Sequence, residues 1–232
     1  MEHVAIGLSI DLPKGRVMRA WVAGEERVVW RSAKGQLFAW DNRCPHRGMR
    51  LSHGFVRVES LACIYHGWHY GENGKCHYIP AHPSMTLHQS IGVTSHAIFE
   101  QQGILWISAG NEPRAPRIPA VGEDSQPLRT LSVECSSDVL LGYLADRDLT
   151  DENGAVLFAS CDTQSPMIIN YLSDDSAFRV SLLIQAVADN SANIHMLCSM
   201  HWSIPGRVHL SRWGDSIRRG AEAADAKRGP AR

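Results

Sequence analysis

Two short motifs in the first third of the chain contain four residues of the types that bind metals. The first is Cys-x-His, with Cys44 and His46, and the second is Cys-x-x-His, with Cys63 and His66. Two thiolates and two imidazoles can hold a tetrahedral zinc ion, or a [2Fe–2S] cluster in which two histidines replace two cysteines on one iron. Either centre would join two loops that are sixteen residues apart in the sequence.

The spacing within the motifs separates the two alternatives. Zinc sites favour two to four residues between paired ligands, whereas one residue lies between Cys44 and His46. In the mixed cluster each loop supplies a cysteine to one iron and a histidine to the other, and both motifs can do this. Gly48 and Gly67 follow the histidines closely and would let backbone N–H groups approach the cluster. The pattern therefore predicts a [2Fe–2S] cluster.

The flanking residues carry a family resemblance. They read C-P-H-R-G at residues 44–48, Y-H-G-W-H-Y at residues 65–70, and G-K-C at residues 74–76 leading to I-P-A at residues 79–81. With these motifs, residues 1–110 resemble the Rieske domain of bacterial aromatic-ring hydroxylating and demethylating oxygenases, in their terminal component. The resemblance implies a Rieske oxidoreductase that passes electrons from a reductase toward a mononuclear non-haem iron, which activates O2 for hydroxylation or demethylation.

The same resemblance indicates the subtype of cluster. Respiratory-chain Rieske proteins join their two loops by a disulfide, and the matching positions here are Met49 and Tyr65. Trp68 stands where those proteins have a serine that donates a hydrogen bond to the cluster. A cluster with one hydrogen bond fewer should have a potential near the low end of the Rieske range, at about −150 mV.

The pattern of short apolar runs and turns predicts the fold class. Residues 1–110 should form an all-β Rieske domain, and the Pro-rich, aperiodic residues 111–128 a linker. Residues 129–232 should form a smaller α+β domain with a surface helix over residues 212–225. This part resembles a portion of the helix-grip catalytic domain of the oxygenases, shortened relative to the family. Residues 138–144 and 155–159 fit either strands or short helices.

A mononuclear iron in this domain would need two histidines and a carboxylate. No histidine lies between His96 and His195. His195 and His201 stand at an even separation in a strand-like segment and would share one face, and Asp189 could complete a triad. The competing interpretation is a pair of strand histidines in a β-rich core. Three functions remain open. The chain is a Rieske-oxygenase component that delivers electrons to a mononuclear iron in this chain or in a partner subunit, a ferredoxin-like electron carrier, or a non-catalytic subunit lacking its own mononuclear iron.

Other polar and aromatic residues near the motifs have structural interpretations. The resemblance places Cys76 in a hairpin, and we interpret it as a structural residue and not a fifth ligand. His69 and His77 should pack or face solvent and not relay protons. Trp40 and Trp68 should cover the cluster and keep water away from it.

Composition and charge limit the kinds of binding partner and the cellular location that we expect for this protein. The formal net charge is −1, and 44% of the residues are apolar, which fits a folded protein and gives no sign of nucleic-acid binding. The sequence predicts no membrane helix and no secretory signal, so we expect a cytoplasmic protein. The resemblance implies a flavin- and NADH-linked reductase or a ferredoxin as electron donor. It further implies a homo-oligomer or an oxygenase partner subunit.

Overall fold

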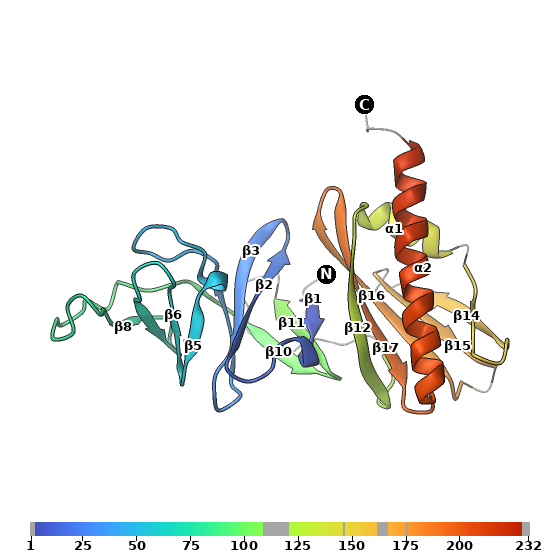
Figure 1. Ribbon diagram of the computed structural model, residues 1–232, viewed down its shortest axis with the longest axis horizontal. Coiled ribbons are helices and arrows are strands. Elements are labelled where there is room, and N and C mark those ends of the chain that lie inside the picture. Colours follow the sequence, from blue (N-terminus) through green and yellow to red (C-terminus); the bar gives the residue numbers. More distant parts are fainter. Residues whose placement is uncertain (1–2, 109–120, 146, 162–166, 175, 229–232) are drawn as a thin grey trace. The chain divides into compact units, whose positions relative to one another are not determined.

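The computed structural model describes residues 3–108, 121–145, 147–161, 167–174 and 176–228 (Figure 1). The chain divides into two compact units, one built mainly from residues before 109 and the other mainly from residues after 120. Each unit has its own hydrophobic core. We describe them separately as the N-terminal unit and the C-terminal unit.

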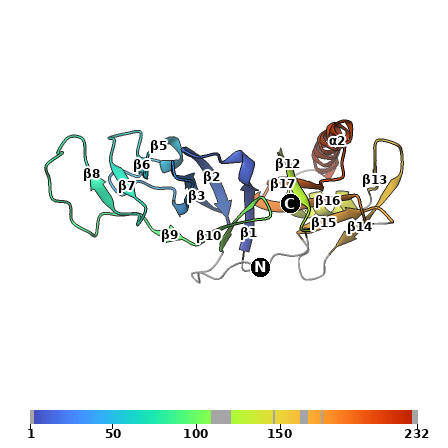
Figure 2. The same cartoon turned by 90° about the horizontal axis from the view of Figure 1, so that it is seen from below.

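The N-terminal unit consists of three small sheets (Figure 2). The first has the order β1 (His3–Leu8), β11 (Ile104–Ser108), β10 (Ile98–Gln101). The second has the order β2 (Arg16–Val22), β3 (Glu25–Arg31), β4 (Leu37–Asp41), β9 (Ser95–His96). The third has the order β5 (Phe55–Arg57), β6 (Ser60–Ala62), β7 (His69–Gly71), β8 (Cys76–Tyr78). Two 3₁₀ turns complete it, η1 (Ser9–Asp11) and η2 (Leu51–His53).

Strand β3 contributes to two cores because successive side chains of a strand point to opposite faces. Val29 packs into the core shared with β1 and β11. Val28 and Trp30 point the other way, into the core beneath the predicted ligand loops. There Trp30 meets Trp40 edge to face, with ring centroids 5.1 Å apart. This aromatic layer gives the loops a rigid floor.

The third sheet positions the two predicted ligand motifs. The connection between β4 and β5 carries Cys44 and His46, and the loop between β6 and β7 carries Cys63 and His66. Strands β6 and β7 pair antiparallel, with Leu61 opposite Tyr70. Both of these side chains are fully buried. The second loop is therefore the end of a hairpin whose strands are anchored in the core.

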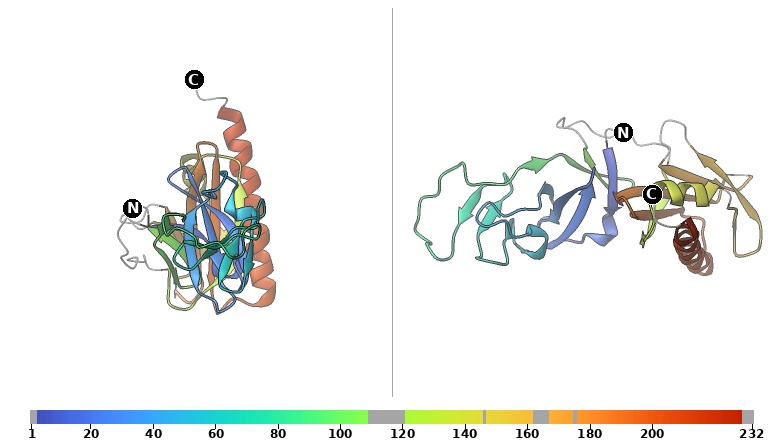
Figure 3. Two further views of the ribbon diagram at one scale, coloured as in Figure 1. Left: turned by 90° about the vertical axis from the view of Figure 1, so that its left-hand side faces the viewer. Right: turned by 90° about the horizontal axis from the view of Figure 1, so that it is seen from above.

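The C-terminal unit is one six-stranded antiparallel sheet with two helices. The strand order is β12 (Ser125–Val133), β17 (Ser191–Ser199), β16 (Arg179–Ala188), β15 (Ile168–Leu172), β14 (Val156–Cys161), β13 (Leu149–Thr150). The helices are α1 (Ser137–Ala145) and α2 (Ile204–Arg228). The long helix α2 lies along one face of the sheet (Figures 1 and 3).

Helix α2 is held against the sheet by an apolar stripe. Leu210, Ile217 and Ala221 are buried at spacings of seven and four residues, which places them on one side of the helix. Trp213 meets Tyr171 of β15 edge to face, with ring centroids 5.3 Å apart. Arg129 of β12 adds a 3.2 Å ion pair to Asp215.

The predicted fold class is confirmed: an all-β Rieske fold is followed by an α+β unit. The two undecided segments resolve into helix α1 and strand β14. Of the predicted linker, residues 111–120 lie outside the described residues, and strand β12 already begins at Ser125. Pro127 is tolerated there because β12 is an edge strand with an irregularity between Pro127 and Arg129.

The helix expected over residues 212–225 begins eight residues earlier, at Ile204. Ser203 caps it, since its hydroxyl accepts a 3.0 Å hydrogen bond from the Gly206 N–H. Pro205 stands in the first turn, where its missing N–H costs nothing. None of the described helices is long and apolar enough to cross a membrane.

A pair of helical glycines tests how closely α2 packs. A Cβ at Gly214 would lie 2.7 Å from Met196 Sδ, whereas a Cβ at Gly142 of α1 would meet nothing within 4 Å. We expect Gly142→Ala to stabilise the protein by about 1 kcal/mol through helix propensity. Gly214→Ala should destabilise it by about 1–3 kcal/mol through overpacking. Chemical denaturation of both variants measures the difference, and equal stabilisation would contradict the close packing.

Candidate metal centre

The first predicted ligand loop is a tight turn closed by its own backbone. The Cys44 N–H donates to the Met49 carbonyl at 2.8 Å, and the Gly48 N–H donates back to the Cys44 carbonyl at 2.8 Å. Gly48 has φ +71°, a left-handed conformation that glycine adopts without strain. Within this turn Cys44 is buried, with 4% of its surface exposed, whereas His46 is partly exposed.

The second loop repeats the same turn. The Cys63 N–H donates to the Trp68 carbonyl at 2.9 Å, and the Gly67 N–H donates to the Cys63 carbonyl at 3.0 Å. Gly67 has φ +67°, and a Cβ there would lie 2.9 Å from Pro80 Cγ. The two motifs differ in histidine spacing but share one backbone turn, so each presents a buried cysteine and a more exposed histidine.

The structure brings the four predicted ligand side chains together. The imidazole rings of His46 and His66 meet edge to face with centroids 4.6 Å apart. The thiols of Cys44 and Cys63 interact with each other in the protein interior. Burial raises the pKa of the Cys63 thiol, and the neighbouring Cys44 raises it further. Two thiolates in this position require a compensating cation, which iron would supply.

An unpartnered nitrogen supports a metal at this position. His46 Nδ1 is buried and has no hydrogen-bond partner in the described part of the chain. Burial lowers the pKa of His46, and the nearby His66 and Arg47 lower it further, so the imidazole stays neutral and keeps a lone pair to give. Among the described residues, no group of three or more His, Cys, Asp or Glu could hold a single metal ion.

Aromatic side chains cover both imidazoles. The Trp68 indole stacks on His46, with centroids 4.2 Å apart and planes within 7° of parallel. The Tyr65 ring lies against the His66 imidazole, with ring centroids 3.9 Å apart. The predicted covering role of Trp68 thus takes the form of a direct stack, while Trp40 is buried in the core below. These contacts fix the ring orientations that metal ligation needs.

The sequence interpretation missed one residue of the site, Tyr70. Its hydroxyl lies 3.0 Å from Cys44 Sγ, and its side chain is fully buried. Burial raises the Tyr70 pKa far above its usual range, with Cys44 adding to the effect, so the phenol stays protonated. Toward a Cys44 thiolate, which can only accept, the Tyr70 hydroxyl would be the donor.

The neighbouring histidines and Cys76 have local structural partners. Cys76 is buried, and its thiol donates a long hydrogen bond of 3.8 Å to the Tyr78 carbonyl. His69 Nδ1 lies 3.3 Å from the Ser60 hydroxyl. His77 is exposed. These positions agree with the structural roles that we expected for them.

The structure does not bring together the three candidates for a mononuclear iron. His195 is fully buried, with Nδ1 3.1 Å from the Thr130 hydroxyl and Nε2 3.2 Å from Gln185 Oε1. His201 is 59% exposed and pairs at 3.6 Å with Asp124. Asp189 is exposed in the turn before β17, whereas His201 follows that strand. Nine extended residues separate them by roughly 30 Å.

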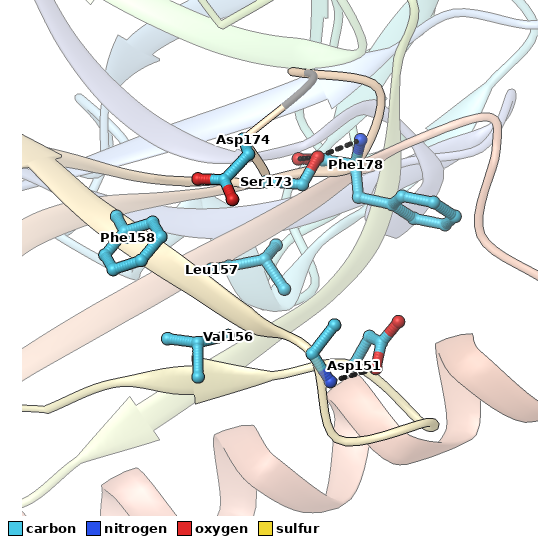
Figure 4. Close-up of a pocket in the computed structure, with 8 residues that line it drawn as sticks. Asp151, Val156, Leu157, Phe158, Ser173, Asp174 and Phe178 are labelled. Carbon is cyan, nitrogen blue, oxygen red and sulfur yellow. Dashed lines mark hydrogen bonds between the residues drawn. The ribbon is translucent and has the colours of Figure 1, made fainter.

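A pocket of about 450 Å³ opens on the C-terminal unit (Figure 4). Val156, Leu157 and Phe158 of β14 form one wall, and no histidine lines it. The Asp151 carboxylate accepts the backbone N–H groups of Asn153 and Ala155 at 2.8 Å each. Among the described residues its lining thus combines an apolar wall with the carboxylates of Asp151 and Asp174.

Comparison with known proteins identifies the N-terminal unit. Residues 2–96 match the family model of the Rieske [2Fe-2S] domain. The chain is 35% identical over 136 residues to oxidoreductase NdmD of Pseudomonas putida, which covers 58% of this chain and 23% of that protein. It is 32% identical over 122 residues to the 3-chlorobenzoate-3,4-dioxygenase oxygenase subunit of Comamonas testosteroni. This match covers 52% of this chain and 28% of that protein. The matched part thus spans less than a third of either relative.

Solved structures match the fold of nearly the whole chain. NdmA of Pseudomonas putida CBB5 superposes with a TM-score of 0.73 at 18% identity, over 95% of this chain and 80% of that one. Apo dicamba monooxygenase superposes with a TM-score of 0.73 at 16% identity, over 97% of this chain and 86% of that one. At these identities the likeness concerns the fold.

The fold and the paired loops define an iron–sulfur protein with a [2Fe–2S] cluster. Residues 2–96 match the family model of the Rieske [2Fe-2S] domain, and the predicted resemblance to Rieske non-haem iron oxygenases is confirmed by these relatives and, for the fold, by the structural neighbours.

The two loop glycines should differ in their tolerance of a side chain. Gly48→Ala adds a Cβ into open space and costs only the left-handed conformation, about 1–2 kcal/mol. Gly67→Ala adds the same cost and a contact with Pro80, so it should lose more stability and retain less cluster. Iron content and thermal unfolding of the purified variants measure both effects. A more damaging Gly48→Ala would contradict the geometry of the second loop.

Removing the Tyr70 hydroxyl should make the cluster harder to reduce. A hydrogen bond to a ligating sulfur stabilises the reduced state, so Tyr70→Phe should lower the reduction potential while the cluster stays bound. Tyr78→Phe, at an exposed tyrosine of β8, is the matched control and should leave the potential unchanged. Redox titration followed by EPR compares them. Equal potentials in all three proteins would show that the hydroxyl does not act on the cluster.

Proposed function

We propose that this protein carries electrons in a Rieske oxygenase system. Cys44 and Cys63 would hold one iron of the cluster, and His46 and His66 the other. The observation that supports this assignment most directly is that His46 Nδ1, on the same loop as the buried Cys44, is buried without a hydrogen-bond partner among the described residues. When bound, a [2Fe–2S] cluster supplies one-electron transfer.

The surrounding residues define what the chain itself contributes. Tyr70 holds a proton at its hydroxyl oxygen and directs it to Cys44 Sγ. Trp68 and Tyr65 orient the imidazoles and limit the access of water to them. His66 is the exposed member of the four and is the natural point of electron entry and exit. The electron donor would be a flavin- and NADH-linked reductase or a ferredoxin.

The electron acceptor would be a mononuclear non-haem iron that activates O2 for hydroxylation or demethylation. In the described part of the chain, both nitrogens of His195 are engaged by other side chains, and His201 lies apart from it. We therefore propose that the acceptor iron belongs to a partner subunit, with oligomerisation as part of the mechanism. The alternatives are a ferredoxin-like carrier that needs no such subunit, and a non-catalytic subunit.

Counting metals separates these functions. We expect two irons and two sulfides per chain, with the reduced-state EPR signal of a His-ligated cluster and a potential near −150 mV. Cys63→Ala should lose the cluster, whereas His201→Ala should keep it. A third iron per chain that is lost in His195→Ala would contradict the external acceptor. A clearly positive potential would contradict the oxygenase-type cluster, and a single zinc would overturn the proposal altogether.

A further inference from the structure

The pocket of the C-terminal unit has a wall of exposed apolar side chains (Figure 4). Val156 is 43% exposed and Phe158 57% exposed, although both are large hydrophobic residues. Leu157, between them, is buried in the core that the sheet shares with α2, because successive side chains of a strand point to opposite faces. Val156 and Phe158 are therefore left on the outer face of β14, where they line the pocket.

A second aromatic side chain of the lining is held in place by the core. Phe178 packs against the core of the C-terminal unit and meets Trp202 edge to face, with ring centroids 5.3 Å apart. The Phe178 N–H donates a 3.0 Å hydrogen bond to the Ser173 hydroxyl, and the Ser173 N–H donates to the Phe178 carbonyl at 3.0 Å. These contacts hold both ends of the turn between β15 and β16. The pocket volume of about 450 Å³ lies in the range of small-molecule sites.

Two carboxylates lie on the same lining, and they come from two different turns. Asp151 belongs to the turn between β13 and β14, and Asp174 to the turn between β15 and β16. Figure 4 shows Asp174 above and Asp151 below the side chains of β14. The Asp174 side chain is exposed and makes no hydrogen bond or ion pair with another described residue. Its carboxylate is therefore available to a ligand in the pocket.

The turn that carries Asp151 keeps its carboxylate ionised. The carboxylate accepts the backbone N–H groups of Asn153 and Ala155. Burial acts to raise the pKa of Asp151, but these N–H groups outweigh it and hold the pKa below its usual value. At least one carboxylate of the lining is therefore negatively charged at neutral pH.

The segment that builds the pocket is strongly acidic. Residues 148–178 contain six Asp or Glu and no Lys, Arg or His, a formal net charge of −6. The whole chain has a net charge of −1, so the remaining residues sum to +5. Among the described residues, no basic side chain lines the pocket. A field of one sign around an open pocket favours the entry of cations and disfavours that of anions.

We propose that this pocket binds a small organic cation, in which an ammonium group is joined to an aromatic or aliphatic body. The apolar body lies against Val156 and Phe158, and the ammonium group pairs with the carboxylates of Asp174 and Asp151. The ring of Phe158 suits both parts, because an aromatic face attracts a cation as well as an apolar group. The site lies wholly in the C-terminal unit, so the inference goes beyond the proposed electron transfer and does not depend on it.

Calorimetric titration of the purified full chain with 2-phenylethylammonium tests the proposal. At low salt we expect a dissociation constant of about 1 mM or below, an ordinary affinity for a ligand of this size. 2-Phenylethanol, which has no charge, and ethylammonium, which has no ring, should each bind at least roughly tenfold more weakly, since each lacks one half of the recognition. Equal binding of 2-phenylethanol would show an apolar surface only, and equal binding of ethylammonium a general attraction of cations. Either result would overturn the site.

Asp174→Asn and Asp189→Asn form a matched pair of variants. Both remove one negative charge from an exposed turn, at opposite ends of β16, and the ten extended residues of that strand separate the turns by roughly 30 Å. Asp174→Asn should weaken the binding of 2-phenylethylammonium roughly tenfold at low salt and less at high salt, because screening reduces the attraction. Asp189→Asn should leave it unchanged. Equal weakening by both variants would show a response to net charge alone and would contradict the pocket.

The apolar wall is tested separately with Phe158→Ala. This variant should weaken the binding of 2-phenylethylammonium roughly fivefold, because it removes an aromatic surface from the lining. Thermal unfolding shows whether the C-terminal unit stays folded, and the ligand series with Asp174→Asn decides the question where it does not. Unchanged binding in a folded Phe158→Ala would overturn the site. Binding of a lysine-rich peptide, with none of 2-phenylethylammonium, would assign the acidic segment to a basic protein partner and would equally overturn it.

Discussion

The N-terminal unit is organised around two buried thiols that need positive charge. Cys44 and Cys63 are almost fully buried and interact with each other, and burial raises the pKa of Cys63. Thiolates there are stable only with a cation between the loops, so folding of the loops and metal binding are coupled. The repeated turn, the tryptophan floor and the Tyr70 hydroxyl all serve to hold sulfur and nitrogen atoms in place for that cation.

Local sequence was enough to predict a set of four ligands, which stays a prediction, but not their surroundings. The spacing of the two motifs encodes the ligand set, and the left-handed conformations of Gly48 and Gly67 follow from the same few residues. The hydrogen bond from Tyr70 to Cys44 crosses from β7 to the first loop, and the stack of Trp68 on His46 also joins the two loops. Contacts of this kind depend on strand register, which no local pattern contains.

The errors in the fold prediction have the same physical origin. Pro127 and its charged neighbours indicate a linker, but an edge strand with an irregularity accommodates them. The apolar periodicity of α2 becomes clear only after residue 210, so its first two turns were missed although Ser203 and Pro205 form a readable start signal. Tertiary packing on the sheet decides such cases, and the spacing of Leu210, Ile217 and Ala221 shows how.

The C-terminal unit retains a sheet and a long helix but uses its central histidine structurally. The carbonyl oxygen of the Gln185 side chain can only accept, so His195 donates to it through Nε2–H and accepts from Thr130 at Nδ1. Ligation of a metal through either nitrogen of His195 would break the hydrogen bond that this nitrogen makes to Thr130 or Gln185, a net loss of about 1 kcal/mol. The sheet is thus stabilised by the same contacts that engage both nitrogens of His195, which is the reason for proposing that the acceptor iron belongs to a partner subunit.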